Sequence, residues 1–305
     1  MDWFQEIFGF KESLENIEKY IQIKNNKLIT STKTRTFTIG KLETPSIKEL
    51  RKRIPLPNGK IKVSQIIDNI VNIHKKEPNA LFQVASQFNL LEMIDSKVSP
   101  KDGITRYQYD MTQGSACAMA CPFGTLYRNY FTNINTLEDI ENMFDKKYWK
   151  MENGYALFEK EDLLTFNEII DNNKEEIIEN LRVGIQWDTE VAKTGELVSQ
   201  IYCSALPVSY HYNIHSDVFE KFARVILEAA YEATFTAAIL NKKSNKVFLT
   251  LVGGGAFGNE RDWILESIEK NLKKFKNYDL DIVFVTYSGN NSYDLDALCK
   301  KYSYI

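Results

Sequence analysis

Residues 249–263 read Leu249-Thr-Leu-Val-Gly-Gly-Gly-Ala-Phe-Gly-Asn-Glu-Arg-Asp-Trp263, an apolar run that breaks into four glycines with one aromatic among them. The whole chain has only 14 glycines in 305 residues, and four of them stand at positions 253–258. An ordinary turn needs fewer glycines than this. The density therefore indicates a backbone that bends sharply, or that lets another group approach it closely.

The segments on both sides of the glycines predict an α/β domain. Apolar residues at three- and four-residue steps predict a helix over 217–240, with Ser216 as its cap. The continuous apolar run 246–252 is typical of a strand that is buried on both faces. A helix, a buried strand and a last short helix are expected over 261–275, 281–287 and 292–302. This order predicts a three-layer α/β/α fold with a mixed central sheet.

The chain before residue 217 gives weaker patterns. The expected elements are a short amphipathic helix over 1–20, two strands over 21–40, a helix over 63–76, a strand over 79–87, helices over 137–147 and 160–179, and two strands joined by a polar turn at 192–196. We expect one elaborated domain over 1–305, with N-terminal strands and a helix over 1–79, a ligand-binding core over 80–130 and 217–305, and an inserted helical and hairpin segment over 131–216.

The glycine loop lies where α/β proteins bind ligands, at the carboxyl end of a strand and before a helix. Consecutive exposed N–H groups at such a place form a site for phosphate, and Phe257 is placed to pack on a sugar or a base. The alternative is a tight strand-to-helix turn with Phe257 in the core. Neither the P-loop pattern nor the dinucleotide pattern is present.

The run from Ala223 to Tyr287 resembles the second half of a macrodomain, the ADP-ribose-binding fold. The segments that carry the resemblance are Leu227-Glu-Ala-Ala-Tyr231, the strand Val247–Val252, the loop Gly255-Ala-Phe-Gly258, the helix Trp263–Phe275 and the strand Asp281–Tyr287. The resemblance implies that this loop wraps a diphosphate and that its aromatic contacts a ribose. The ligand-binding residues that it implies here are Gly253, Gly254, Gly255, Ala256, Phe257 and Gly258.

A looser resemblance covers residues 80–130. Residues 80–89 (ALFQVASQFN) resemble the family's strand that ends near a ribose-binding asparagine, which implies that Asn89 binds ribose hydroxyls. Gln113-Gly-Ser-Ala-Cys-Ala-Met-Ala120 resembles the start of the family's small-residue helix, which adds Gln113, Gly114 and Ser115 to the phosphate site. Residues 37–46 (FTIGKLETPS) resemble the family's early strand, whose acid holds the adenine amino group, and this resemblance implies Glu43 for that role.

Some macrodomains and the related poly(ADP-ribose) glycohydrolases hydrolyse ADP-ribosyl linkages. Their glycohydrolase pattern, three glycines followed by Gln-Glu-Glu, is absent here. The acids near the first loop are Glu92, Asp102 and Asp110, and Asp110 is the best placed, three residues before Gln113. It is our candidate general base or ribose-binding carboxylate. The simpler interpretation is a loop aspartate that forms a turn or caps the next helix.

Composition restricts the remaining possibilities. The net charge is −3, so no nucleic-acid partner is indicated, and no apolar run is long enough for a membrane span. Four cysteines without a C-x-x-C pair suggest a reduced, cytoplasmic protein. We expect neither a metal nor a cofactor: Cys117 and Cys121 are interpreted as packing residues, and His211 and His215 as loop residues. Arg128 is a candidate phosphate ligand or, more simply, half of a surface ion pair.

Three functions follow from these observations. The first is binding of ADP-ribose or a related nucleotide diphosphate with hydrolysis of an ADP-ribose linkage, the partner then being an ADP-ribosylated substrate. The second is a reader that binds ADP-ribose without turnover. The third, from a different class, is a structural or interaction protein with a degenerate pocket.

Overall fold

The computed structural model describes residues 1–33, 35–287 and 293–302. Its helices are α1 (Trp3–Phe8), α2 (Leu14–Tyr20), α3 (Ile47–Arg51), α4 (Ile70–Lys76), α5 (Gln113–Ala120), α6 (Pro122–Phe131), α7 (Glu138–Glu141), α8 (Lys160–Asn180), α9 (Glu220–Leu240), α10 (Arg261–Phe275) and α11 (Tyr293–Tyr302). Short 3₁₀ turns are η1 (Pro100–Asp102), η2 (Thr105–Tyr109), η3 (Val208–Tyr210) and η4 (Ser216–Phe219). Within the described ranges, no helix is both long and apolar enough to cross a membrane.

The strands form one large sheet and two small ones. The strands are β1 (Ile21–Lys24), β2 (Lys27–Thr30), β3 (Thr36–Thr38), β4 (Lys41–Glu43), β5 (Ile61–Ile67), β6 (Leu81–Ala85), β7 (Lys150–Glu152), β8 (Tyr155–Leu157), β9 (Gly184–Glu190), β10 (Leu197–Cys203), β11 (Lys246–Leu249) and β12 (Leu280–Thr286). The large sheet has the order β4-β9-β10-β6-β11-β12-β5. From β10 to β5 all neighbours are parallel, whereas β9 runs antiparallel to both β10 and β4.

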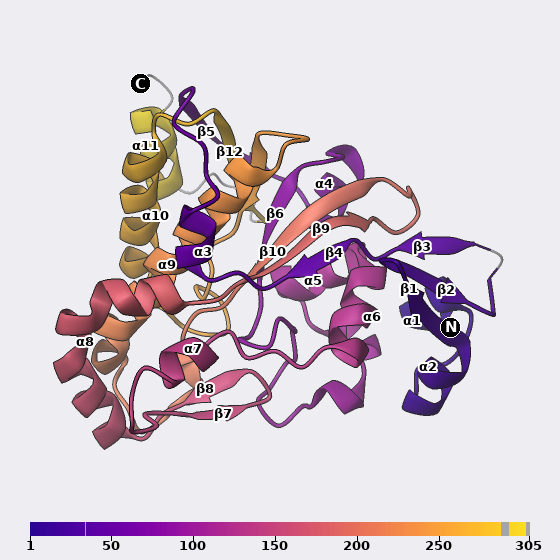
Figure 1. The fold of residues 1–305 in the computed structure, drawn as a ribbon, viewed down its shortest axis with the longest axis horizontal. Coiled ribbons are helices and arrows are strands. Elements are labelled where there is room, and N and C mark those ends of the chain that lie inside the picture. Colours follow the sequence, from indigo (N-terminus) through magenta and orange to yellow (C-terminus); the bar gives the residue numbers. More distant parts are fainter. Residues whose placement is uncertain (34, 288–292, 303–305) are drawn as a thin grey trace.

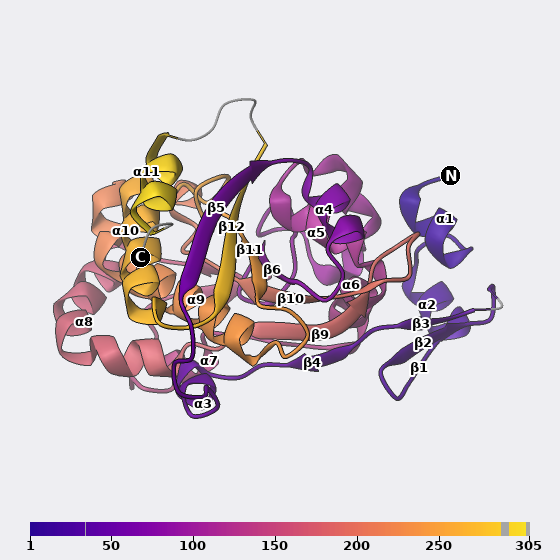
Figure 2. The ribbon, with the colours of Figure 1, turned by 90° about the horizontal axis from the view of Figure 1, so that it is seen from above.

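Helices cover both faces of this sheet, which makes the three layers visible in Figures 1 and 2. On one face, α9 lies against β6, β10 and β11, and α8 and α10 pack on its outer side. Nearly every residue of α9 between Phe222 and Ala238 is buried, as expected for a helix that is covered all round. On the other face, α5 packs on β6, with α4 and α6 beside it. The predicted α/β/α fold with a mixed sheet is therefore what the chain forms.

The N-terminal residues build a separate small layer beside α6, at the right of Figure 1. Helices α1 and α2 and the antiparallel sheet β1-β2-β3 enclose a second core around Phe4, Phe8 and Phe123. The Glu12 carboxylate connects this layer to the first loop of the main domain: it accepts hydrogen bonds from the amides of Ile104 and Thr105 at 2.8 and 2.7 Å. The N-terminal layer thus holds the chain that leads to Asp110.

Two sequence predictions are wrong. Residues 63–76 are not one helix: Ile61 and Val63 alternate inward along β5, and Asn69 then caps the shorter helix α4. The isoleucines and valines of this segment are compatible with the period of a helix and with that of a strand, and pairing with β12 at the sheet edge decides the outcome. Nor is the whole of 131–216 an insertion outside the core. It supplies β9 and β10, and β10 pairs with β6 at the centre of the sheet.

Candidate functional site

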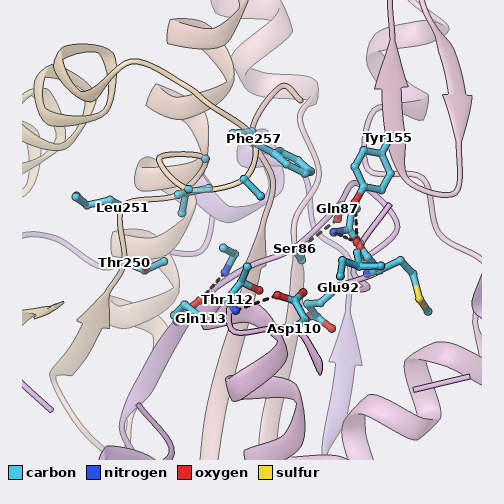
Figure 3. Close-up of a pocket in the computed structure, with 18 of the residues that line it drawn as sticks. Ser86, Gln87, Glu92, Asp110, Thr112, Gln113, Tyr155, Thr250, Leu251 and Phe257 are labelled. Carbon is cyan, nitrogen blue, oxygen red and sulfur yellow. Dashed lines mark hydrogen bonds between the residues drawn. The ribbon is translucent and has the colours of Figure 1, made fainter. Parts of the chain in front are cut away.

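A cavity of about 380 Å³ opens at the carboxyl ends of β6, β10 and β11 (Figure 3). The ladder between β6 and β11 ends at the pair Phe82 and Phe248. Beyond this pair, side chains satisfy the strand ends. The Gln113 amide group donates to Gln83 O at 2.8 Å and accepts from the Ala85 N–H at 3.0 Å, both on β6, and Gln83 Oε1 accepts from the Thr250 N–H after β11 at 3.3 Å. The lining residues are Ala85, Ser86, Gln87, Glu92, Met93, Ile94, Asp110, Met111, Thr112, Gln113, Tyr155, Ala205, Tyr210, Thr250, Leu251, Val252, Gly253, Gly255, Ala256 and Phe257. This is the crevice that open α/β sheets use for ligands.

The glycine loop forms one wall, and its glycines differ in what they do. Gly253 and Gly258 have positive φ values of 79° and 68°, which side chains rarely adopt. A Cβ at Gly258 would also meet the Ser209 hydroxyl at 1.8 Å. A Cβ at Gly255, by contrast, would meet nothing within 4 Å. Gly255 is therefore the glycine whose missing side chain leaves room in the pocket.

Two sets of backbone N–H groups border the cavity without partners. Within the loop, Gly254 and Gly258 donate to backbone carbonyls, but across the described ranges the amides of Gly253, Gly255, Ala256 and Phe257 have no acceptor. On the opposite wall, α5 begins after Thr112 with no side-chain cap, so its first-turn amides have no intrahelical acceptor. The loop amides and the start of α5 at Gln113 thus border one cavity, and unpartnered N–H groups of this kind are what anion sites use.

Phe257 belongs to an aromatic wall. It is 9% exposed, and its ring lies 5.3 Å from that of Tyr155 and 5.7 Å from that of Tyr210. Tyr155 comes from the β7-β8 hairpin and Tyr210 from η3, so the segment 131–216 contributes to the pocket. Phe257 presents one side to the cavity and packs its other side, which is compatible with both interpretations of the sequence.

Asp110 stands between η2 and α5, and both its carboxylate oxygens accept hydrogen bonds. Oδ1 accepts from the Thr112 amide at 2.9 Å, and Oδ2 accepts from the Ser115 hydroxyl at 2.8 Å. The carboxylate thus orders the start of α5 while it lines the cavity. Each oxygen retains a lone pair for a further donor.

Glu92 is a second carboxyl at the cavity, only 3% exposed. Neither of its side-chain oxygens has a hydrogen-bond partner among the described residues. Burial raises the pKa of this carboxyl from 4.5 to about 8; the charge of Arg128 and the nearby Tyr107 hydroxyl oppose the increase, and the charge of Asp110 adds to it. At neutral pH Glu92 is therefore mostly a neutral acid with a proton to donate.

The structure places the predicted site residues in two groups. Asp110, Gln113, Gly253, Gly255, Ala256 and Phe257 line the cavity. Asn89, Gly114, Ser115, Gly254 and Gly258 are not among the lining residues. Asn89 donates to Asn153 O in the β7-β8 turn at 3.0 Å and accepts from the Leu91 amide, so its amide group holds two loops together. The proposed contact of Asn89 with a ribose receives no support from this position.

Gly114 has a packing function. A Cβ here would lie 2.1 Å from the Ala85 carbonyl oxygen and 2.9 Å from Glu92 Cγ, so the glycine lets α5 rest directly on β6. We expect Gly114→Ala to lower the free energy of unfolding by about 2 kcal/mol, because overpacking forces the helix away from the strand. Urea denaturation measures this, with Gly255→Ala as the matched control; equal midpoints for the two variants would contradict the assignment.

The raised pKa of Glu92 makes stability depend on pH. Because the folded protein binds this proton more tightly than the unfolded chain does, the contribution is fully present below about pH 4.5 and is lost as pH rises toward about 8. The stability of the wild type relative to Glu92→Gln should therefore fall by up to about 1.4 kcal/mol per pH unit in this window. Denaturation curves of both proteins at several pH values test this, and parallel curves would show that Glu92 ionises normally.

Other candidates lie elsewhere. Glu43, on the edge strand β4, accepts from Trp187 Nε1 at 2.8 Å and pairs with Arg53, and it does not line the cavity. Cys117 and Cys121 are buried, and so is Arg128, which does not form the surface ion pair that the sequence suggested. No cluster of three metal-ligating side chains occurs in the part of the chain that the structure describes.

Sequence reasoning ranked Glu92 below Asp110 and missed Tyr155 and Tyr210 as wall residues. A signal for Glu92 was available: it is one acid inside the apolar run Leu90-Leu-Glu-Met-Ile94, which indicates a buried carboxyl. No comparable signal marks the two tyrosines, because the hairpin and the 3₁₀ turn that carry them are distant in sequence from the glycine loop.

Comparisons with known proteins find only distant similarity, and only to solved structures. No family model and no curated protein matches the chain. Among solved structures, it is similar to poly(ADP-ribose) glycohydrolase from Thermomonospora curvata, with 10% identity, 94% of this chain and 95% of that chain covered, and a TM-score of 0.48. For the same enzyme bound to the inhibitor ADP-HPD, the identity is 9%, 94% of this chain and 95% of that chain are covered, and the TM-score is 0.49. For poly(ADP-ribose) glycohydrolase from Deinococcus radiodurans in complex with ADP-ribose, the identity is 10%, 85% of this chain and 95% of that chain are covered, and the TM-score is 0.45. TM-scores below 0.5 at this identity establish neither family nor function, so the site's own geometry has to carry the proposal.

Proposed function

We propose that the cavity binds ADP-ribose or a closely related nucleotide diphosphate. The observation that carries the proposal is the pair of unpartnered N–H sets on facing walls, in the loop at Gly253, Gly255, Ala256 and Phe257 and at the start of α5. Each set suits one phosphate, and together they suit a diphosphate. A cavity of about 380 Å³ falls within the range of small-molecule sites.

We further propose that the site hydrolyses an ADP-ribosyl linkage, with Glu92 and Asp110 in different roles. Glu92 is the general acid, which gives its proton to the leaving oxygen as the bond from that oxygen to the anomeric carbon breaks. Asp110 is the general base, which takes a proton from the water that forms the new carbon–oxygen bond. The raised pKa of the buried Glu92 carboxyl supports its role as the acid.

Calorimetric titration tests the binding. ADP-ribose should bind with a Kd in the micromolar range, and AMP, which lacks the diphosphate, should bind at least about tenfold more weakly. No heat at millimolar ADP-ribose would reject the proposal and favour the interaction protein with a degenerate pocket.

Turnover separates the hydrolase from the reader. Release of free ADP-ribose from poly(ADP-ribose) or from ADP-ribosylated peptides, followed by chromatography, would support hydrolysis. Binding without release would leave the reader. The raised pKa of Glu92 at the cavity supports the hydrolase, since a carboxyl with a pKa of about 8 can give a proton near neutral pH.

A further inference from the structure

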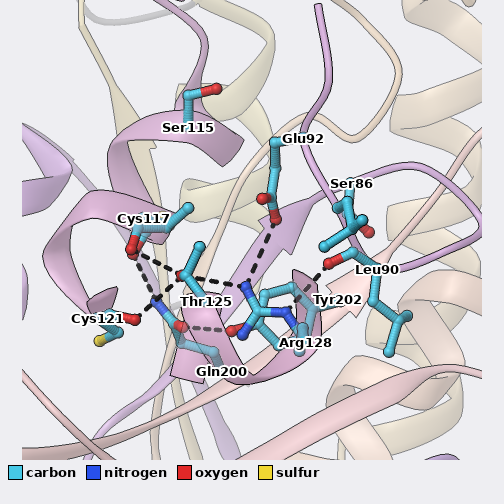
Figure 4. Close-up of polar contacts among 12 residues, drawn as sticks. Ser86, Leu90, Glu92, Ser115, Cys117, Cys121, Thr125, Arg128, Gln200 and Tyr202 are labelled. Carbon is cyan, nitrogen blue, oxygen red and sulfur yellow. Dashed lines mark hydrogen bonds and ion pairs between the residues drawn. The ribbon is translucent and has the colours of Figure 1, made fainter. Parts of the chain in front are cut away.

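Arg128 of α6 does not line the cavity but lies next to Glu92, which does, and its side chain is fully enclosed (Figure 4). Its guanidinium stacks on the Tyr202 ring at 3.7 Å, and its Nε donates to the Leu90 carbonyl at 3.1 Å. Nη2 donates to Thr125 Oγ1 at 3.3 Å, while Nη1 has no partner among the described residues. A cation removed from water in this way is costly unless an anion compensates for it.

Glu92 is the acid that the structure brings close to this cation. Its Oε1 lies 3.9 Å from Arg128 Nη2, longer than the 2.7–2.9 Å of a direct charge-assisted hydrogen bond. Neither carboxyl oxygen of Glu92 has a hydrogen-bond partner among the described residues, and the guanidinium beside them has an unpartnered Nη1, so the two groups lie close without a direct hydrogen bond. A change in the charge of Glu92 is what would join them, because a carboxylate attracts a guanidinium far more strongly than a neutral acid does.

Leu90 connects the two residues through the backbone. It has a positive φ of 65°, a conformation that residues with a Cβ rarely adopt, and its carbonyl accepts the Arg128 Nε–H. Glu92 follows two residues later. The arginine therefore holds the turn that carries Glu92 and stands at the same time behind its carboxyl group.

We propose that Arg128 is the positioning residue of the acid: it fixes the turn at Leu90 and becomes the partner of the Glu92 carboxylate once the proton has left. The catalytic use of this pair rests on the proposed function, but the pairing itself does not. Over a reaction cycle the Glu92 proton passes to the leaving oxygen, Arg128 approaches the carboxylate, and reprotonation from solvent separates them again.

Several other titratable groups face Glu92, and the test requires that their charges do not change in the pH range where Glu92 titrates. They are Tyr107 of η2, Asp110, Cys117 of α5 and Tyr202 of β10. Burial raises the pKa of Tyr107, of Cys117 and of Tyr202, so these three stay neutral where Glu92 titrates. Arg128 is the cation in this set, which makes its removal the informative change.

The test follows the Glu92 proton directly, without substrate. Infrared spectra of the wild type against pH contain the C=O band of a protonated buried carboxyl, and Glu92→Gln identifies the band by removing it. In Arg128→Met the midpoint of this band should rise by at least about one pH unit, whereas Arg128→Lys, which keeps the charge, should stay within about half a unit. An unchanged midpoint in Arg128→Met would overturn the pairing and reduce Arg128 to a packing residue.

If Arg128→Met does not fold, the wild type still decides. The ¹⁵N resonance of Arg128 Nε, assigned by its absence in Arg128→Lys, should shift with the midpoint of the Glu92 band and stop shifting in Glu92→Gln. A chemical shift of Arg128 Nε that does not change at the pH midpoint of the Glu92 band would overturn the proposal.

Activity supplies the second readout. In Arg128→Met, kcat should fall by about 10- to 100-fold with KM within about threefold, and the alkaline limb of the pH profile should move upward with the infrared midpoint. If no ADP-ribosyl substrate is turned over but the infrared midpoint moves, the proposed function has failed and the pairing has not. If substrate is turned over but the alkaline limb of the pH profile is the same in Arg128→Met as in the wild type, the proposed function stands and the positioning proposal is wrong.

Discussion

Replacing Gly255 by glutamate is expected to weaken ADP-ribose binding by at least about 100-fold while leaving the stability of the protein unchanged. A Cβ at this position meets nothing within 4 Å, and the backbone is not in the left-handed region, so the fold has room for a side chain. The added carboxylate would stand in the space where we place the diphosphate. Like charges in a partly dewatered site repel by several kcal/mol.

Two controls separate charge from bulk. Gly255→Gln has the same size without the charge and should weaken binding less than the glutamate does. Gly255→Ala should bind within a few-fold of the wild type. Calorimetry measures all three, and thermal melting verifies that each variant is folded. Undiminished affinity in the glutamate variant would place the ligand elsewhere.

Position 255 is a sharper test than the neighbouring glycines. A Cβ at Gly254 would lie 3.0 Å from Ile264 Cδ1, and Gly254 does not line the cavity. Gly253 and Gly258 have positive φ, so any side chain there strains the loop itself. Loss of binding in those variants would report a damaged loop rather than an occupied phosphate site.

Replacing Glu92 by glutamine is expected to lower turnover by about 10²- to 10⁴-fold with little change in ADP-ribose affinity, because glutamine fills the same space but has no acid proton. The wild-type rate should be highest where Glu92 is protonated and should fall as pH rises through about 8, the value to which burial raises the pKa of this carboxyl. Initial rates of ADP-ribose release between pH 5.5 and 9.5 measure this limb.

Asp110→Asn is the matched comparison. It should also lower turnover, since asparagine cannot accept the proton of the attacking water, but it keeps one acceptor for the capping bonds at Thr112 and Ser115. If Glu92→Gln retains full turnover and Asp110→Asn does not, Glu92 is not the acid. If both variants are fully active, the hydrolytic proposal is wrong and any ADP-ribose binding would be that of a reader.

The glycine loop and the elements around it could be predicted from the sequence because their signals are local. Helix α10 has the predicted bounds, and β11 and β12 lie within or next to theirs, since continuous apolar runs between helical periods leave little choice. The segment that became β5 and α4 was mispredicted because its apolar positions fit both periods. The central place of β10 was missed because strand order depends on pairing between distant segments, which no local pattern records.

The sequence predicted part of the cavity lining, including the side chains of Asp110, Gln113 and Phe257. Gly253, Gly255 and Ala256 line the cavity as expected because a glycine-rich strand-to-helix loop has few alternative geometries. Gly114 and Asn89 turned out to serve packing and loop connection, which depend on the Ala85 carbonyl and on the β7-β8 turn. The buried pair of Glu92 and Arg128 needed the fold, since its members are 36 residues apart and come from different elements.

The most direct test of the central claim is amide ¹H–¹⁵N mapping of the protein during titration with ADP-ribose. The account predicts that the largest shifts fall on the unpartnered amides of Gly253, Gly255 and Ala256 and on Gln113 at the start of α5, and that AMP moves them less. Shifts that leave both of these segments unperturbed, or no shifts at millimolar ADP-ribose, would contradict the claim that facing N–H groups form a diphosphate site.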